Sequence, residues 1–416
     1  MRKKVVVGGL LLGLLLLIAG YFGANFQFEQ QIEVANEHFK KGEFGPARVS
    51  ARSALQFAVT QSKQDRANLV LARATLADQT MGEQLLENAY LALEQIGPSS
   101  PVYPDAAAER ARQLLLTKIE VRGAERLLDE VKSLSPDHLE TNQLLFLIYC
   151  LTNRPERADP VFWLGFRQIP ADEKPNAFRQ WFLSQFTRNG ANRGFDTGTG
   201  IVPANREPSD DDIIQRFIAF KNSEPDEAIH YGAMASWWLF RTETKTALEI
   251  LQTGQERSKT VAEEVYLSSL VHALLNQGNL EQVKLLLDQW PENERGFSYL
   301  RHLGVYQESV NERAQAVETY KKCIEIWPGP IDANVRHRLG RCLKELGQTE
   351  EAEKVAAQTE IVRSWLEDRW GLVRKAIDYL HDDEAVGVLR EFFTAIGKRE
   401  AVEYLTQYQA ELEAKK

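Results

Sequence analysis

The sequence predicts an all-α protein, a solenoid of helical hairpins preceded by one apolar N-terminal helix. Two patterns predict the solenoid: small residues recur at a fixed interval, and apolar residues recur at helical spacing around them. A third pattern, an uncharged run after a basic start, predicts the apolar helix. A chain of 416 residues commonly forms roughly two or three domains, but a solenoid is one continuous array whose units contact only their neighbours.

The N-terminal segment has the length of a membrane-spanning helix. Arg2, Lys3 and Lys4 precede an uncharged, Leu-rich run over residues 5–24. At 1.5 Å per residue such a run reaches about 30 Å, the thickness of the hydrocarbon core of a bilayer. The basic start keeps the N-terminus in the cytoplasm, so residues 27–416 lie on the exported side, which in a double-membraned bacterium is the periplasm.

Two interpretations of this segment remain open. An uncleaved signal anchor is favoured because the residues around Ala19 and Gly20 have weak cleavage chemistry. A cleaved secretory signal would instead release a soluble exported protein. Gly9 and Gly13 match the G-x-x-x-G spacing of closely packed membrane helices and would allow a weak homodimer, although Gly is common in such helices.

The first predicted hairpin shows the repeated spacing most clearly. Ala35 is followed seven positions later by Gly42 and twelve positions later by Ala47. An interval of twelve also separates Ala235 from Ala247, Gly304 from Ala316, and Gly340 from Ala352. A third small residue follows seven positions later in three of the four copies: Ala54, Gly254 and Cys323. Because two helices approach to about 8–10 Å only where the crossing residues are small, this spacing predicts antiparallel hairpins.

Capping residues and apolar periodicity predict further helices in chain order. In the N-terminal half they cover residues 29–41, 46–59, 62–78, 82–95, 105–118, 123–133, 138–151 and 155–167. A helix over 172–187 then leads into a glycine-rich loop over 189–208, after which Asp210, Asp211 and Asp212 begin the next helix. Helices over 367–380, 383–396 and 398–413 form a charged C-terminal cap.

The pattern resembles the tetratricopeptide repeat, and the copy with Gly304, Ala316, Tyr320, Cys323 and Pro328 carries the resemblance best. In weaker copies Arg112 and Phe146 stand where the first small residue belongs. The helix-B markers fall at residues 47, 85, 124, 158, 247, 283, 316 and 352, with Leu85 and Val283 as stand-ins for a small residue. The resemblance implies about eight to ten hairpins and a concave face, lined by the first helix of each hairpin, that binds a protein or peptide.

The single irregular interval between markers, from 158 to 247, locates an atypical repeat with the inserted loop 189–208. This loop is either a specialised contact or a tolerated surface insertion. The predicted organisation is therefore a membrane helix over 1–26, N-terminal repeats over 27–170, the atypical repeat over 171–227, C-terminal repeats over 228–364 and a helical cap over 365–416.

Motif searches predict no catalytic, cofactor-binding or metal-binding residues. The seven histidines are scattered without H-E-x-x-H or paired-Cys spacing, and no nucleophile elbow or phosphate-binding loop is present. We therefore expect no enzyme, no cofactor and no metal, while an enzyme of envelope metabolism built on a helical solenoid remains an alternative that needs a cluster of acidic or His side chains on the concave face. The net charge of −9 disfavours nucleic acid as a partner.

Several single residues carry narrower predictions. Cys323 and Cys342 fall on helices predicted to be neighbours, so whether they pair in an exported protein stays open. Trp238 is predicted to be a core residue, while Trp237, Trp365 and Trp370 are left open. The carboxylate clamp of some tetratricopeptide proteins needs a Lys three before the small residue and an Asn one after it. Asn36 fits but Ile32 replaces the Lys, so this clamp is not expected.

Together these patterns predict a membrane-anchored scaffold that presents a tetratricopeptide-like solenoid on the exported side. A soluble exported binding protein is the alternative if the signal is cleaved. In both cases the partner is an unidentified protein or peptide on the concave face.

Overall fold

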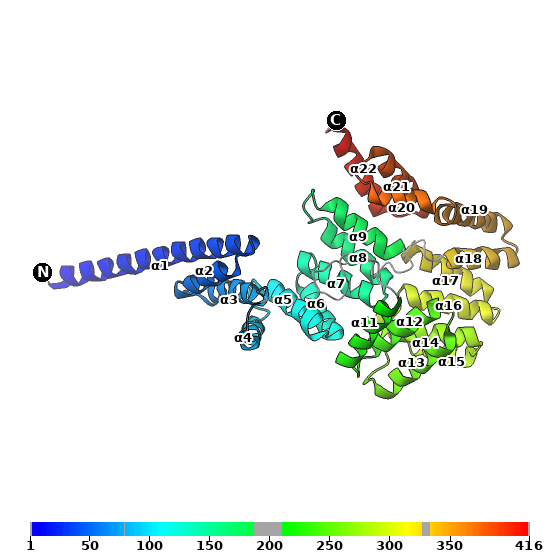
Figure 1. Ribbon diagram of the computed structural model, residues 1–416, viewed down its shortest axis with the longest axis horizontal. Helices are drawn as coiled ribbons and strands as arrows, with labels where there is room; N and C mark the ends of the chain where they lie inside the picture. Colours follow the sequence, from blue (N-terminus) through cyan, green and yellow to red (C-terminus); the bar gives the residue numbers. More distant parts are fainter. Residues whose placement is uncertain (1, 79, 187–209, 327–332, 415–416) are drawn as a thin grey trace. The chain divides into compact units, whose positions relative to one another are not determined.

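The computed structural model describes residues 2–78, 80–186, 210–326 and 333–414, with side chains described for all of these except 2–19, 185, 186 and 333. The described residues form helices joined by short turns and contain no strand (Figure 1). The predicted loop 189–208 lies outside the described residues. Of the helices that flank it, α9 (Lys174–Phe186) begins and ends close to the predicted limits 172–187, and α11 (Asp210–Ser223) begins where predicted.

The helices alternate as the first and second members of antiparallel hairpins. In the N-terminal part they are α1 (Arg2–Lys40), α2 (Phe44–Gln56), α3 (Gln61–Leu76), α4 (Glu83–Glu94), α5 (Tyr103–Gln113) with a π-helical last turn (Leu114–Lys118), α6 (Val121–Leu134), α7 (Leu139–Leu151) and α8 (Pro155–Phe166). The C-terminal part contains α12 (Ala228–Phe240), α13 (Thr244–Arg257), α14 (Glu264–Gln277), α15 (Leu280–Asp288), α16 (Phe297–Ser309), α17 (Arg313–Ile326), α18 (Ala333–Glu345), α19 (Thr349–Leu366), α20 (Trp370–Asp378), α21 (Asp383–Ile396) and α22 (Arg399–Ala414).

Eight hairpin turns among the described residues have one residue in the left-handed region of φ at the same place in the repeat, whereas the described residues of the turn between α3 and α4 have none. Gly42, seven residues after Ala35, has a φ of 74°. The same offset of seven residues applies to seven other first positions, namely Arg112, Phe146, Ala235, Val271, Gly304, Gly340 and Arg390. It leads, in the same order, to Ile119, Asn153, Thr242, Gly278, Asn311, Gly347 and Gly397. All of these have positive φ, between 58° and 79°. The backbone therefore keeps one repeat register even where the side chains depart from the pattern, and this confirms a tetratricopeptide-like, all-helical repeat fold.

The small residues that predicted the hairpins lie at helix crossings. Ala35, Ala47 and Ala54 are fully buried. A Cβ atom on Gly304 would lie 2.4 Å from Cε1 of Tyr320 on α17, so only glycine fits this crossing. Where larger residues stand at the first position, as Phe146 does, the neighbouring side chains adapt: its ring lies 5.3 Å from that of Phe162.

One helix-B marker is wrong. Leu85 on α4 is 47% exposed and is not a crossing residue, whereas Ala89, one turn later, is buried in the core between α3, α4 and α5. The turn between α3 and α4 extends from residue 77 to residue 82 and is longer than the turn between α1 and α2, which covers residues 41–43. This longer turn shifts the second helix relative to the twelve-residue spacing.

The core also decides the open questions about cysteine and tryptophan. The thiols of Cys150, Cys323 and Cys342 are buried and form no disulfide, and the last two lie within one cluster of α16 to α19. Trp238 packs against the core of α12 to α14, as predicted. Trp237 and Trp365 are buried as well, and Trp370 stacks on Phe182 with 5.8 Å between ring centroids.

The chain divides into two compact units, which are described separately below. Unit 1 comprises Met1–Lys118 and Gly123–Leu144, and unit 2 comprises Ile119–Arg122 and Leu145–Lys416. The division falls inside the predicted N-terminal repeats 27–170.

The part of the chain with described side chains begins at residue 20, and none of its helices combines the length and apolarity needed to cross a bilayer. Most of the predicted span over residues 5–24 lies outside that part, as do Gly9 and Gly13 of the predicted dimer contact. The backbone of α1 itself is continuous from Arg2 to Lys40.

Candidate functional site: an open groove on the first hairpins

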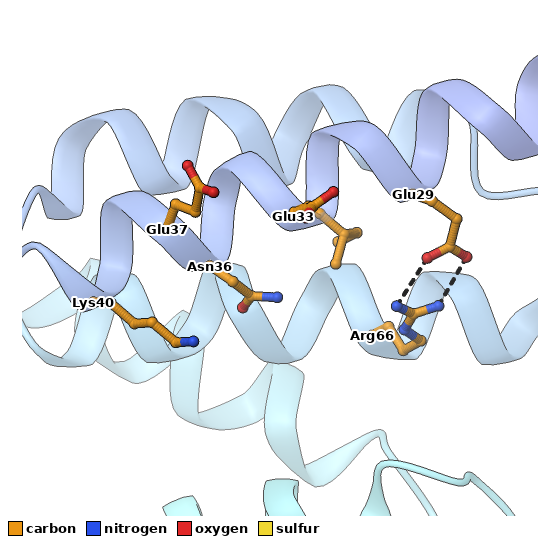
Figure 2. Close-up of a pocket in the computed structure, with 7 residues that line it drawn as sticks. Glu29, Glu33, Asn36, Glu37, Lys40 and Arg66 are labelled. Atoms are coloured by element: carbon orange, nitrogen blue, oxygen red, sulfur yellow. Dashed lines mark hydrogen bonds and ion pairs between the residues drawn. The ribbon is translucent and has the colours of Figure 1, made fainter.

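Unit 1 carries an open groove on the first helices of its first two hairpins. The groove has a volume of about 410 Å³ and is lined by Glu29, Ile32, Glu33, Asn36, Glu37 and Lys40 of α1 and by Arg66 of α3. Spacings of three and four residues put the α1 side chains on one helical face. Figure 2 shows Glu29, Glu33, Asn36, Glu37 and Lys40 along α1, with Arg66 of α3 opposite Glu29. The groove lies on the first helices of the hairpins, where the repeat pattern predicts a partner.

The charges along this groove are unevenly paired. Nη1 and Nη2 of Arg66 donate to Oε1 and Oε2 of the Glu29 carboxylate, at 2.9 Å and 3.1 Å. Glu33, Glu37 and Lys40 are exposed, and no hydrogen bond or ion pair joins any of them to another described side chain. Two neighbouring carboxylates therefore face solvent on the groove wall, and their charge is available to a ligand.

The groove lacks the chemistry of a carboxylate clamp. Ile32, which stands where that clamp needs a Lys, is 4% exposed and belongs to the apolar core with Phe28 and Ala54. Asn36 lines the groove and is exposed. Because Glu33 and Glu37 flank Asn36, a carboxylate ligand would be repelled here.

Further along unit 1 the same face is closed by internal ion pairs. Arg73 of α3 donates to Glu140 at 2.8 Å and to Asp105 at 3.2 Å. Arg112 of α5 pairs with Glu140 and lies 3.8 Å from the carboxylate of Glu109. A hydrogen bond from His138 and the nearby charge of Arg73 lower the pKa of Asp105. These charges satisfy one another, in contrast to Glu33 and Glu37.

In unit 2 the corresponding face is covered by the chain itself. Asn153, in the turn between α7 and α8, donates to Ser236 of α12 at 2.8 Å, and Arg157 of α8 donates to Glu264 of α14 at 2.5 Å. Ser298 of α16 donates to Glu156 of α8 at 3.4 Å. Ser236 follows Ala235 as Asn36 follows Ala35, and Ser298 precedes Gly304 by the six residues that separate Glu29 from Ala35. Three successive first helices thus contact α8 and the turn before it, where unit 1 has an open groove.

The contact of α8 with α14 and α16 contains acidic and histidine side chains, the kind that the alternative prediction of an enzyme requires. Burial and the neighbouring Glu264 carboxylate raise the pKa of Glu156 to about 7. Burial and the charge of Arg301 lower the pKa of His272 to about 4, and burial places the pKa of His302 well below its usual value. Glu264 and His302 are buried, however, and His302 already bonds to Ser268 at 2.9 Å. The cluster therefore lies at the contact between α8 and the repeats, where its members bond to one another.

A buried ion pair joins the C-terminal cap to α8. Lys398, in the turn between α21 and α22, donates to Asp159 of α8, and both residues are 6% exposed. The indole N–H groups of Trp163 and Trp181 donate to the other oxygen of Asp159, at 3.1 Å and 3.0 Å. Aromatic rings from α8, α9, α21 and α22 surround this pair, with Phe178 and Phe393 5.7 Å apart. No sequence motif indicated it, because 239 residues separate the two partners.

The described side chains contain no group of three His, Cys, Asp or Glu residues placed to hold a metal ion. The three carboxylates at the start of α11 lie in its first turn, as predicted, and Asp210 pairs with Arg241 of α12.

Neither a known family model nor a curated protein matches this sequence. Among solved structures, the chain is similar to the APC/C hetero-tetramer Cut9-Hcn1, with a TM-score of 0.36, 11% identity, and 92% of this chain and 72% of the other covered. It is also similar to a tetratricopeptide repeat protein from Parabacteroides merdae, with a TM-score of 0.27, 13% identity, and 68% and 99% covered. A third similar structure is the human IFIT1 dimer with PPP-AAAA, with a TM-score of 0.33, 12% identity, and 91% and 89% covered. At these TM-scores the repeat assignment rests on the hairpins and their left-handed turns alone.

Proposed function

We propose that this protein is a membrane-anchored scaffold that binds a peptide segment of a partner protein in the groove of α1 and α3. The anchor is the apolar segment over residues 5–24, and the repeats lie on the exported side. The observation that carries the proposal is the open face of α1, where Glu33 and Glu37 are exposed and unpaired. The corresponding face of α12, α14 and α16 is already contacted by α8 and the turn before it.

The charge of the groove supports a basic segment as its ligand. Arg66 neutralises Glu29, so Glu33 and Glu37 outnumber the remaining cation, Lys40. An extended or helical peptide with Lys or Arg side chains would pair with these two carboxylates. Exposed ion pairs are each worth less than about 1 kcal/mol and are screened by salt, so binding should weaken as the ionic strength rises. A nucleic acid would meet the same two carboxylates and be repelled.

A photo-crosslinking experiment in cells tests this site. A photoreactive amino acid at position 36 should yield a discrete cross-linked adduct that mass spectrometry can identify. The same residue at position 84, on the exposed surface of α4, is the control and should not give that adduct. Identical adducts from both positions, or none from position 36, would argue against the groove.

Charge reversal tests the ligand chemistry. The double variant Glu33→Lys/Glu37→Lys should lose most of the position-36 adduct, and about tenfold in affinity for the identified segment, because two favourable pairs become two repulsions of about 0.5 kcal/mol each or more. Glu83→Lys/Glu87→Lys provides a matched control, since these two residues are also exposed and four apart in unit 1, but on α4. Equal loss from both variants would mean that overall charge, and not the groove, governs binding.

The anchor is tested separately. The full-length chain should stay with the membrane after alkaline carbonate extraction, and its intact mass should include residues 1–24. A mature N-terminus near residues 20–25 would instead support the soluble exported alternative. Protease or thiol-reagent access from the exported side, measured before and after membrane disruption, reports on which face of the membrane the repeats lie.

A further inference from the structure

We propose that Tyr21, Phe22 and Phe26 of α1, together with Lys63 of α3, form a collar that lies in the lipid headgroup layer. The groove then stands at a short, fixed height above the bilayer, and its occupant is a juxtamembrane segment of a membrane protein. This inference rests on the anchor proposed above and adds the location of the groove and the class of its partner.

The first observation is the exposure of the three aromatic side chains. Tyr21, Phe22 and Phe26 are 51%, 66% and 68% exposed, so neither α2 nor α3 covers them. They directly follow the Leu-rich run, and the first charged residue after Lys4 is Glu29. Amphipathic and aromatic rings favour the boundary between hydrocarbon and water, where membrane helices are enriched in Tyr and Trp. Their position at the end of the apolar run identifies lipid as what covers them.

A second observation comes from a different helix. Lys63 of α3 donates to Asn25 of α1, and its ammonium lies 4.7 Å from the centroid of the Phe28 ring. The fold thus brings a cation to the level of α1 at which the aromatic rings occur, although 38 residues separate Lys63 from Asn25. A long basic side chain at this level can reach the phosphate groups of lipids while its stem packs on an aromatic ring.

Because α1 is continuous, it fixes the distance between the collar and the groove. One unbroken helix runs from Arg2 to Lys40, and its N-terminal half extends beyond α2 and α3 (Figure 1). At 1.5 Å per residue, Glu33 lies about 10 Å and Lys40 about 21 Å beyond Phe26 along the helix axis. With no flexible linker between membrane and groove, the groove stays within about 20 Å of the bilayer, which is where the juxtamembrane segments of membrane proteins are found.

Depth measurements on the full-length chain test the collar. Spin labels on Gly23→Cys, Gln30→Cys and Glu37→Cys form a ladder along one side of α1, since seven residues make about two helical turns. The three native cysteines are buried and should stay unlabelled. A Cβ atom at Gly23 meets nothing within 4 Å, so the label there fits. The protein is reconstituted in vesicles of phosphatidylethanolamine with a minority of phosphatidylglycerol.

The expected result is a graded change in relaxation by oxygen, which partitions into lipid, and by a water-soluble nickel complex. Position 23 should respond mainly to oxygen, position 37 mainly to nickel, and position 30 should lie between them. Equal access of nickel to positions 23 and 37 would overturn the collar. Protection of position 23 from both reagents would also overturn it, because a protein would then cover this face.

Two variants separate the collar from the binding site. Phe22→Ser/Phe26→Ser should move the position-23 label toward water by about one helical turn, ~5 Å, whereas Leu85→Ser/Leu91→Ser, which removes two exposed apolar side chains of α4, should not. An insertion of eighteen helical residues between Gln27 and Phe28 makes about five full turns and raises the groove by about 27 Å without rotating it. It should abolish the cross-link to the partner in cells but leave the affinity for its isolated peptide in detergent unchanged. Unchanged cross-linking by the insertion variant would reject the height requirement. If the chain without the insertion does not bind the isolated peptide, the groove itself is rejected as the binding site.

Discussion

At the scale of single residues, the backbone conformation of the turns follows the repeat more closely than the residue types do. Positions seven residues after the first crossing residue have positive φ whether they hold glycine, as at Gly42, or not, as at Thr242 and Ile119. A non-glycine residue is uncommon in this region and carries a conformational cost, so packing of the two helices must enforce the turn. The weaker copies of the pattern therefore belong to the same array even where Arg112 replaces the small residue.

The two glycines at the first crossing position make a matched test of this packing. Gly304→Ala should destabilise the protein by about 1–3 kcal/mol, because the added methyl group overlaps the buried Tyr320 ring. Gly340→Ala should be neutral or stabilise by about 0.5–1 kcal/mol, since its nearest neighbour is Val355 Cγ1 at 3.6 Å and alanine favours the helix. Urea denaturation midpoints of the two variants report the difference. Equal effects would mean that helix propensity, and not the crossing, dominates.

At the scale of elements, the docking of α8 on α14 and α16 depends on titratable groups. Arg157 of α8 pairs with Glu264 and Glu294. The charges of Glu264 and Arg301 also act on the carboxyl group of Glu156. The pKa of Glu156 in the folded protein, about 7, lies above its ordinary value of 4.5, so the folded state holds its proton more tightly. This group contributes stability that is present below pH 4.5 and is lost as the pH rises toward 7. The lowered pKa values of His272 and His302 act in the opposite direction, because their protonation opposes folding at acidic pH.

Glu156→Gln isolates the carboxyl contribution, because the amide keeps the acceptor for Ser298 but does not titrate. The variant should match the parent near pH 5 and exceed its stability near pH 8 by on the order of 2 kcal/mol. Thermal unfolding across this pH range measures the difference. Glu292→Gln, at an exposed position before α16, is the control and should leave the pH profile unchanged. A constant offset at all pH values would show that Glu156 is ionised throughout the range.

At the scale of the molecule, unit 2 departs from an open solenoid because its last hairpin returns to α8. In a linear array each repeat contacts only its neighbours, but Lys398 and Asp159 join helices that are 239 residues apart. Trp163 and Trp181 complete the coordination of the carboxylate within an apolar cluster, so neither charge reaches water. Unit 2 should therefore unfold more cooperatively than a repeat array of the same length.

Lys398→Met tests this closure. Loss of the ammonium leaves the buried Asp159 carboxylate uncompensated, which typically costs about 3–5 kcal/mol. Hydrogen exchange of α8, α21 and α22 should then accelerate together. Lys284→Met breaks an exposed pair with Asp288 and should leave all exchange rates unchanged. Acceleration confined to α22 would indicate a local contact and not a link between distant helices.

The sequence by itself determined the helices, their pairing into hairpins and the all-α repeat class. These depend on local periodicity, on caps and on small residues at fixed intervals, all of which are visible within one or two repeats. It also predicted that Trp238 packs in the core and that Ile32 excludes a carboxylate clamp. The membrane span, the exported location and the loop over 189–208 stay predictions from sequence.

Only the tertiary structure decided which part of the concave face is available. Glu33 and Glu37 look no different in sequence from the carboxylates at Glu109 and Glu140, yet the first two face solvent and the others pair with Arg112. The occupation of α12, α14 and α16 by α8, and the link from Asp159 to Lys398, depend in the same way on distant partners. Burial and charge pairing are set by what the chain brings together from far apart, whereas periodicity reports only what neighbouring turns of a helix have in common.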